Sequence, residues 1–170
     1  LNQVGNYWNV RKYFIDKFSL EKFNETQSLS FTQKEYNEYF DPDKEGVKVL
    51  NPIDQTQEYL RTNLYYSLIK TFKFNYDQNN FSGKYFEINN IYNNSNNKNY
   101  KMIPKQDYTL GFLVPDNNSD INPIQYIASL LRKIIPGVSF EQLSKPGFHH
   151  NNSYVIMVDN KLIGHTGQLS

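Results

Sequence analysis

The spacing of apolar residues predicts three helices in this chain. Val10, Phe14 and Phe18 stand four residues apart with charged residues between them, which predicts an amphipathic helix over residues 7–18. A second stripe at the same spacing predicts a helix over residues 59–74 that packs on a sheet; it consists of Leu60, Leu64, Leu68 and Phe72. The third helix has an apolar face formed by Ile124, Ile127, Ala128, Leu131 and Ile134.

Two Asn-Pro pairs mark the expected starts of the second and third helices. Asn51-Pro52 and Asn122-Pro123 each combine a side chain that can cap a helix with a proline suited to the first turn. Pro136-Gly137 is expected to end the third helix.

Short alternating or apolar runs predict strands between these helices. They cover residues 28–32, 47–50, 84–92, 108–114, 154–158 and 161–167. The run 84–92 is expected to have one apolar face, and Asp159-Asn160 is expected to form a two-residue hairpin turn. The acidic segment 33–46 is expected to be a partly helical surface, and residues 93–99 a polar hairpin tip. Together these elements predict an α+β fold with a mostly antiparallel sheet.

Composition narrows the functional classes. The chain has 170 residues, a formal net charge of +1 and no cysteine, which excludes a disulfide framework and a thiolate metal site. No apolar run approaches the roughly 18 residues that span a bilayer, so a cytoplasmic protein without membrane contact is expected. Residues 61–105 hold seven Lys/Arg against two acids, which is compatible with a solvated face or with a tRNA-facing patch.

Three motifs follow one another at a spacing typical of one family. They are Leu50-Asn51-Pro52, Leu60-Arg61-Thr62-x-Leu64 and Phe86-Glu87-Ile88. Their order resembles the β subunit of phenylalanyl-tRNA synthetase, a class II aminoacyl-tRNA synthetase, and Asp159-Asn160-Lys161-x-Ile163-Gly164 is similar to a segment near the end of that family's module. The sequence departs from the family pattern at Asn89, where glycine is usual, and at His150, Asn151 and Asn152. The resemblance implies a class II antiparallel sheet flanked by helices.

The resemblance also implies what this chain lacks. Class II catalysis stabilises the charge on the α-phosphate of ATP with an arginine after the second motif strand and another after a glycine-rich segment. The chain contains three arginines, Arg11, Arg61 and Arg132, and Asn93 stands where the first phosphate-binding arginine is expected. The resemblance therefore implies a catalytic-like module without catalytic, cofactor-binding or metal residues of its own.

By the same resemblance, residues 1–170 are a single module taken from a longer chain. It would pack against the α subunit in an (αβ)₂ enzyme that joins phenylalanine to tRNA(Phe) with ATP and Mg²⁺, which bind elsewhere. The stripe Val10, Phe14 and Phe18, with Arg11 beside it, faces either its own sheet or an α-subunit helix; the family favours the second. An autonomous RNA-binding module and a free-standing adenylate-forming enzyme remain as alternatives.

Five side chains have competing roles on the sequence alone. Arg61 either anchors the preceding loop through carbonyl hydrogen bonds, which we favour, or contacts tRNA or a partner. Tyr7 and Trp8 either pack or stack on a base, and packing is favoured. His149 and His150 are weak metal candidates because adjacent residues on a strand point apart and no third ligand is evident.

Overall fold

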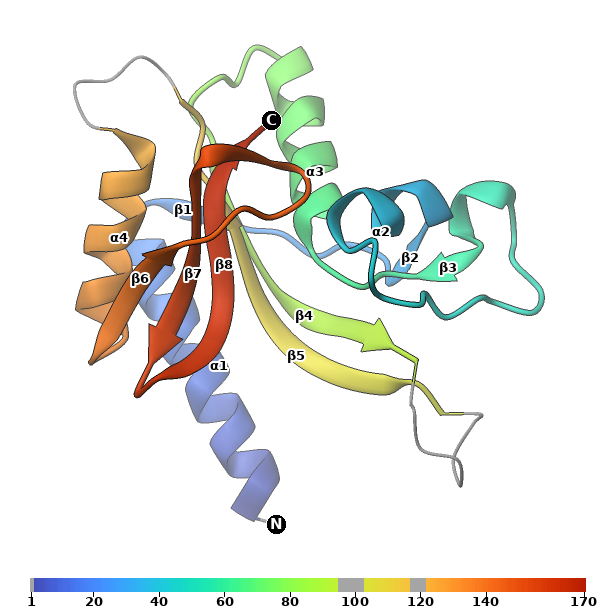
Figure 1. The fold of residues 1–170 in the computed structure, drawn as a ribbon, viewed down its shortest axis with the longest axis horizontal. Coiled ribbons are helices and arrows are strands. Elements are labelled where there is room, and N and C mark those ends of the chain that lie inside the picture. The colour runs from blue at the N-terminus through green and yellow to red at the C-terminus, as the bar shows by residue number, and fades with distance from the viewer. Residues whose placement is uncertain (1, 95–102, 117–121) are drawn as a thin grey trace. The chain divides into compact units, whose positions relative to one another are not determined.

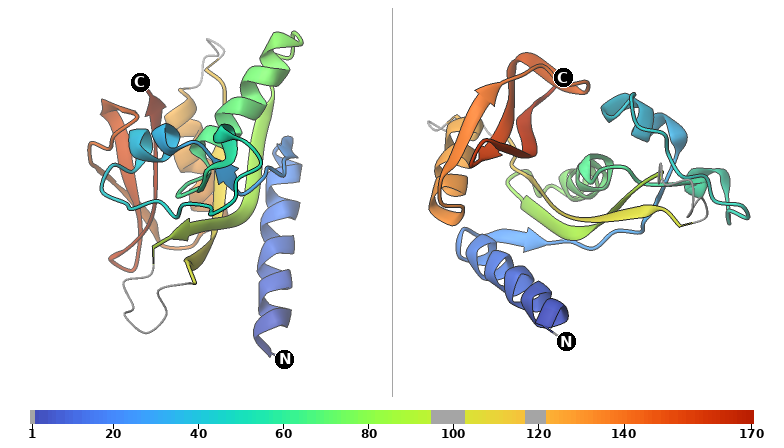
Figure 2. Two further views of the ribbon diagram at one scale, coloured as in Figure 1. Left: turned by 90° about the vertical axis from the view of Figure 1, so that its right-hand side faces the viewer. Right: turned by 60° about the horizontal axis from the view of Figure 1, so that its bottom comes forward.

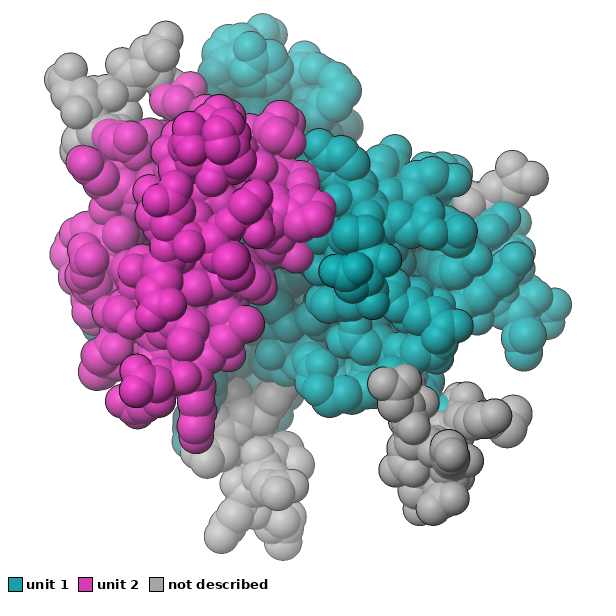
Figure 3. All heavy atoms as spheres, viewed as in Figure 1, with its two compact units in different colours: residues 1–113 teal, residues 114–170 magenta. Residues whose placement is uncertain are grey.

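The computed structural model describes residues 2–94, 103–116 and 122–170 (Figure 1). These residues group into two compact units, Leu1–Leu113 (unit 1) and Val114–Ser170 (unit 2), coloured separately in Figure 3. The predicted polar tip lies outside the described residues from position 95 onward. Each unit has its own core and is described by itself.

A three-stranded sheet in the order β1-β4-β5 forms the centre of unit 1. β4 (Lys84–Asn93) pairs antiparallel with β5 (Lys105–Leu113), as the hairpin prediction required, and β1 (Phe23–Glu25) runs parallel to β4. β1 was missed by the sequence-based prediction because three residues are too few to show alternation.

The two faces of this sheet are covered by different helices (Figure 2). On one face, Phe18 of α1 (Asn2–Leu20) is 0% exposed and stacks on Phe86, with ring centroids 5.2 Å apart. Phe23 of β1 and Phe112 of β5 complete this aromatic cluster. Because Phe86 and Phe112 are register partners, strand alternation sends both rings to the α1 side.

The opposite face packs against α3 (Tyr65–Asp77). Tyr85 of β4 forms a buried cluster there with Leu64 and Leu68. Helix and sheet approach closely at Gly111, where a Cβ would lie 2.9 Å from side-chain atoms of both leucines. β4 is therefore buried on both faces, and the prediction of a single apolar face is wrong.

A two-stranded antiparallel sheet of β2 (Phe31–Thr32) and β3 (Tyr59–Leu60) lies beside the central sheet. α2 (Lys34–Phe40) follows β2, and the 3-10 turn η1 (Gln55–Gln57) precedes β3. The predicted strand 28–32 is thus reduced to its last two residues. The predicted strand 47–50 is reduced to a single bridge between Lys48 and Tyr59.

The second helix begins six residues later than predicted. Tyr59 and Leu60 are extended in β3, and α3 starts at Tyr65, whose N–H donates to the side chain of Asn63 at 3.1 Å. Asn51-Pro52 therefore caps no helix; the carboxylate of Asp54 caps η1 instead. The four-residue stripe was misleading because Leu60 belongs to a strand.

Unit 2 packs one helix on an antiparallel sheet. α4 (Pro123–Ile134) begins as predicted, with the Asn122 side chain accepting from the N–H of Ile124 at 2.9 Å. It contacts β6 (Val138–Gln142) and β8 (Lys161–Leu169), and β7 (Phe148–Val158) lies between these strands. The turn joining β7 to β8 has positive φ at Asp159 and Asn160, which confirms the predicted hairpin.

The structure corrects the description of the two adjacent histidines. The rings of His149 and His150 stack with centroids 4.9 Å apart instead of pointing apart. They lie in a stretch of β7 where the register with β8 shifts, and such an irregularity breaks strict side-chain alternation.

We predict that Phe18→Ala lowers the free energy of unfolding by about 3–5 kcal/mol, because it removes the ring that joins α1 to the sheet. Val10 lies on the same helix but is 51% exposed, so Val10→Ala is expected to change stability by no more than about 0.5 kcal/mol. Urea titration followed by circular dichroism measures both. Equal losses in the two variants would contradict the placement of α1.

Candidate functional site

Arg61 joins the small sheet to the central sheet through its main chain. It follows β3 directly, and its N–H donates to the carbonyl of Ser30 at 2.9 Å. Its own carbonyl accepts from the N–H of Tyr92 on β4, also at 2.9 Å. Because Tyr59 and Leu60 pair with β2 and Arg61 is bonded to both sheets, the helix begins only after this residue.

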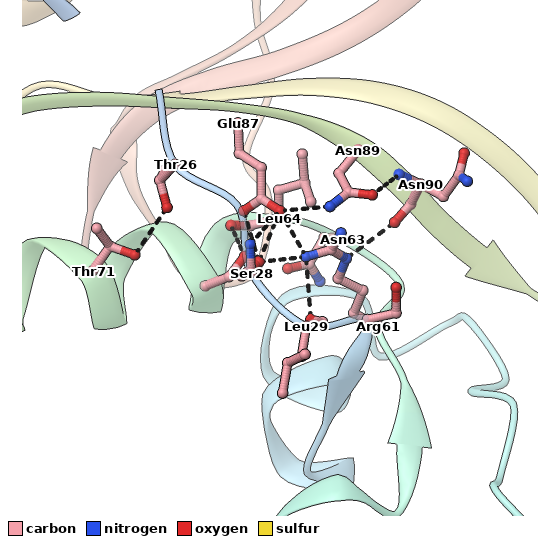
Figure 4. A network of polar contacts seen from close by, with 12 residues as sticks. Thr26, Ser28, Leu29, Arg61, Asn63, Leu64, Thr71, Glu87, Asn89 and Asn90 are labelled. Carbon is pink, nitrogen blue, oxygen red and sulfur yellow. Dashed lines mark hydrogen bonds and ion pairs between the residues drawn. The ribbon is translucent and has the colours of Figure 1, made fainter. Parts of the chain in front are cut away.

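The side chain of Arg61 continues the connection into the interior (Figure 4). The residue is 3% exposed; Nη1 lies 3.0 Å from Oε1 of Glu87, and Nε donates to the carbonyl of Asn90 at 3.0 Å. Nη1 also donates to Oγ of Ser28 at 2.6 Å and to the carbonyl of Leu29 at 3.4 Å. Arg61 thus ties the segment after β1 to β4 by carbonyl and carboxylate contacts.

Glu87 is the buried partner of this arginine. Its residue exposure is 0%, and Oε1 accepts from the Ser28 N–H at 3.1 Å and from the Asn89 side-chain amide at 3.0 Å. The Ser28 hydroxyl donates to the same carboxylate at 2.8 Å. A buried carboxylate needs such donors because desolvation otherwise disfavours its charge. Asn89, a departure from the family pattern, is part of this site.

A second polar cluster holds α2 against the chain that follows Arg61. Thr62 is 0% exposed, and its N–H donates to Oδ1 of Asn37 at 3.0 Å. The hydroxyl of Thr62 and the amide of Asn63 both donate to Oδ2 of Asp41, at 3.1 Å and 2.8 Å. Three consecutive residues, 61–63, therefore fix β4 on one side and α2 on the other.

Each of the three guanidinium groups contacts a neighbour within its own unit. Arg11 forms an ion pair with Glu25, Arg61 pairs with Glu87, and Arg132 lies over the ring of Phe140 at 5.3 Å. At the position expected for a phosphate-binding arginine, Asn93 donates to Asp107 at 3.5 Å. Lys105, its register partner, forms an ion pair with the same carboxylate at 2.9 Å.

The predicted interface residues of α1 occupy different environments. Phe18 is in the core of unit 1, Phe14 is half-buried, and Arg11 is bound to Glu25 on β1. Val10 is exposed, and so are Trp8 at 59% and Tyr13 at 42%. The sheet therefore covers the carboxyl-terminal end of the stripe but leaves apolar surface at its amino-terminal end. The Tyr7 side chain lies outside the described part of the chain.

Sequence reasoning singled out Arg61 but missed Glu87 and Ser28 as its partners. On the sequence alone, residues 84–92 and 28–32 are predicted strands, and neither Glu87 nor Ser28 is assigned a contact with Arg61. The sequence offered one signal: Arg61 lies in the Leu-Arg-Thr motif and Glu87 in the Phe-Glu-Ile motif. These motifs do not show that the two side chains are in contact. Within the described residues, no three His, Asp or Glu side chains are grouped to hold a metal, and no helix combines the length and apolarity that a membrane span requires.

The fold is that of a class II aminoacyl-tRNA synthetase. The structure is similar to the pyrrolysyl tRNA synthetase PylSc of Desulfitobacterium hafniense, with a TM-score of 0.67 and 12% sequence identity. The match covers 94% of this chain and 55% of that chain. At this identity the likeness establishes the fold alone, and it confirms the predicted α+β class.

The sequence identifies the family more closely. The family described as "Phenylalanyl tRNA synthetase beta chain CLM domain" matches residues 16–170, so this chain belongs to it. The Phe-tRNA ligase β subunit of Malacoplasma penetrans is 29% identical over 96% of this chain and 22% of its own length. The corresponding β subunit of Clostridium acetobutylicum is 28% identical over 99% of this chain and 19% of its own length. The chain thus spans about a fifth of these curated relatives.

We predict that Glu87→Gln lowers the free energy of unfolding by about 3–5 kcal/mol, because it leaves the buried Arg61 without a countercharge. Chemical denaturation measures the loss. The matched control is Asp77→Asn, which breaks the surface pair of Lys73 and Asp77 and should cost no more than about 0.5 kcal/mol. The effects of Glu87→Gln and Arg61→Met should be strongly non-additive; additive losses would show that the pair is not coupled.

Stability should fall at high pH because of two tyrosines that pack near α2. Burial, followed by a hydrogen bond to Tyr36, raises the pKa of Tyr66 to about 12, and burial also raises the pKa of Tyr65. Since an unfolded tyrosine titrates near pH 10, this contribution is complete below about pH 10 and is lost as the pH rises towards 12. Urea midpoints at pH 9, 10 and 11 should decline less in Tyr66→Phe than in the wild type.

Proposed function

We propose that this chain is a non-catalytic structural module of the β subunit of a phenylalanine–tRNA ligase. It packs against the α subunit and helps to assemble the (αβ)₂ enzyme that attaches phenylalanine to tRNA(Phe). The main support for this proposal is that all three guanidinium groups contact partners within the chain, so none is left to bind the phosphates of ATP. Family membership supports the β-subunit assignment.

Amino acid activation by a class II enzyme requires preorganised cations around the phosphates of ATP. A guanidinium suits this task because its planar fork donates two parallel hydrogen bonds. Arg61 is the arginine nearest in sequence to the motif strand, yet it is buried against Glu87 and donates to β4 and to the segment after β1. Redirecting it towards a nucleotide would leave Glu87 buried without its countercharge.

The exposed apolar side chains of α1 between positions 8 and 13 form the surface we assign to the α subunit. Val10, Trp8 and Tyr13 are exposed, whereas Phe18 fixes the other end of the helix in the core. A rigid helix with exposed apolar side chains is suited to packing against a second helix because little conformational freedom is lost on association. Arg11 holds α1 to β1 through its ion pair with Glu25. Val10 and the half-buried Phe14 supply the contact surface.

The complete enzyme would use ATP and Mg²⁺ at residues outside this chain and would act in the cytoplasm. Contacts with tRNA(Phe) would come from the assembled enzyme. An autonomous RNA-binding module is the second candidate, supported only by the excess of basic residues in 61–105. Lys73 and Lys105 in that segment are paired with Asp77 and Asp107, which weakens this alternative because paired lysines release fewer counterions on binding phosphate.

We predict that the chain co-purifies with the α subunit and that Val10→Asp reduces the yield of complex at least tenfold, since it places a charge in an apolar contact. The matched control is Ile163→Asp on β8, because Ile163 has the same exposed fraction as Val10, 51%. Size-exclusion chromatography of co-expressed subunits measures the complex. If both variants bind like the wild type, α1 is not the interface.

Calorimetric titration of the isolated chain with ATP, Mg²⁺ and phenylalanine should give no saturable heat at micromolar concentrations. We expect no binding because Arg11, Arg61 and Arg132 already contact partners within the chain. Micromolar binding would instead favour a free-standing adenylate-forming enzyme. Tight tRNA binding with steep salt dependence would favour the RNA-binding module.

A further inference from the structure

The first of the three family-like motifs, Leu50-Asn51-Pro52, lies on the surface of unit 1. The other two motifs meet inside the unit through Arg61 and Glu87. Asn51-Pro52 caps no helix, and all three residues of the motif are exposed. They stand in the connection that runs out from α2 and returns to β3 (Figure 1). The packing of unit 1 therefore does not explain why an apolar residue occupies this position.

Leu50 and Ile53 are the most exposed large apolar side chains in the described part of the chain. Their exposed fractions are 94% and 88%, and the next highest is 79%, at Leu20. Side chains this exposed stay in water when the chain folds, so they add almost nothing to the stability of unit 1. Two such side chains three positions apart on one loop indicate a surface that a partner covers.

The loop that carries these side chains, residues 47–60, has an ordered base. The N–H of Val49 donates to the carbonyl of Glu58 at 2.7 Å. The N–H of Leu60 donates to the carbonyl of Val47 at 2.9 Å. Pro52 fixes its own backbone φ angle between the two exposed side chains. Loop 47–60 is therefore preorganised, and little conformational freedom is lost when its tip is covered.

The surroundings of loop 47–60 are acidic. Residues 33–58 hold seven Asp/Glu against three lysines, although the whole chain has a formal net charge of +1. All three lysines are already engaged: Lys34 pairs with Glu38, Lys44 pairs with Asp41, and Lys48 lies over the ring of Tyr59. The negative charge of this segment is therefore only partly neutralised from within.

Three carboxylates of the segment are open to an external partner. Glu35, Asp43 and Glu45 are exposed, and they form no ion pair among the described residues. Glu45 stands five positions before Leu50 in the sequence, and Asp54 directly follows Ile53. A partner that covers the two apolar side chains consequently meets negative charge beside them, and complementary positive charge on the partner would favour its approach.

This combination decides between the two macromolecules that the proposed function supplies, tRNA(Phe) and the α subunit. A tRNA is lined with phosphates, which the carboxylates repel. Leu50 and Ile53 are aliphatic and offer no aromatic face on which a base could stack. A protein surface can bury both side chains in an apolar hollow and place lysine or arginine at its rim. The α subunit is the partner that fits.

We propose that loop 47–60 is a second docking element for the α subunit, in addition to the exposed side chains of α1. Leu50 and Ile53 insert into an apolar hollow of that subunit, and basic side chains around the hollow face Asp43 and Glu45. The inference rests on the proposed function and adds to it the chemistry of a contact that α1 does not supply.

Calorimetric titration of the chain with purified α subunit tests the apolar part of the contact. The double variant Leu50→Ser, Ile53→Ser should raise the Kd roughly tenfold or more, because it removes the aliphatic groups that binding buries. Its Tm should stay within about 2 °C of the wild type, since both side chains are exposed in the free chain. The matched control is Leu143→Ser, at a residue of unit 2 that is 52% exposed, and it should leave the Kd unchanged.

The titration separates failure of this inference from failure of the proposed function. If the wild-type chain does not bind the α subunit, the proposed function is wrong and the inference falls with it. If the wild type binds and Val10→Asp weakens binding while the double serine variant does not, α1 is an interface and loop 47–60 is not. Only the inference is then overturned.

Charge reversal tests the predicted chemistry of the partner surface. Asp43→Lys combined with Glu45→Lys should weaken binding to the α subunit and flatten its dependence on salt concentration, since attraction between opposite charges is screened by salt. Tighter binding or an unchanged salt dependence would show that the partner surface is not basic. The proposal is also wrong if the double serine variant leaves the α-subunit Kd unchanged and instead weakens binding to tRNA(Phe) or self-association of the chain.

Discussion

The buried ion pair between Arg61 and Glu87 is the interaction on which the rest of unit 1 depends. It joins the link before α3 to the middle of β4, where both side chains are buried. A buried pair of this kind is weak as a source of net stability, because desolvation offsets most of its attraction. Its effect is instead to exclude other arrangements, since any shift of β3 relative to β4 would leave a charge unpaired.

The packing around this pair follows from β4 being buried on both faces. Phe86 places an aromatic ring against α1, and Tyr85 and the carboxylate of Glu87 lie on the side of α3. Gly111, the register partner of Glu87, permits the close approach of α3 to the sheet. Gly111 thus allows α3 to pack closely on one face of the sheet, and the stacked rings of Phe18 and Phe86 join α1 to the other face.

The same pair links the architecture to the proposed function. In an adenylate-forming class II enzyme, arginines near the central sheet must be free to receive phosphate. Here the arginine of the Leu-Arg-Thr motif is used to hold strands together, and Arg11 braces α1 against β1. Under the proposed function, the exposed apolar side chains of α1, and not these arginines, would meet the partner subunit.

The sequence by itself determined the elements with strong local signals and the family. α4 was predictable from its cap and apolar face, and the β7–β8 turn from Asp159-Asn160, because these depend on neighbouring residues. Only the tertiary structure decided where α3 begins, that Glu87 is buried and that Ser28 and Asn89 surround it. The reason is physical: a backbone bond from Arg61 to Ser30 and a contact from Arg61 to Glu87 connect residues far apart in the chain, and no local pattern records such pairings.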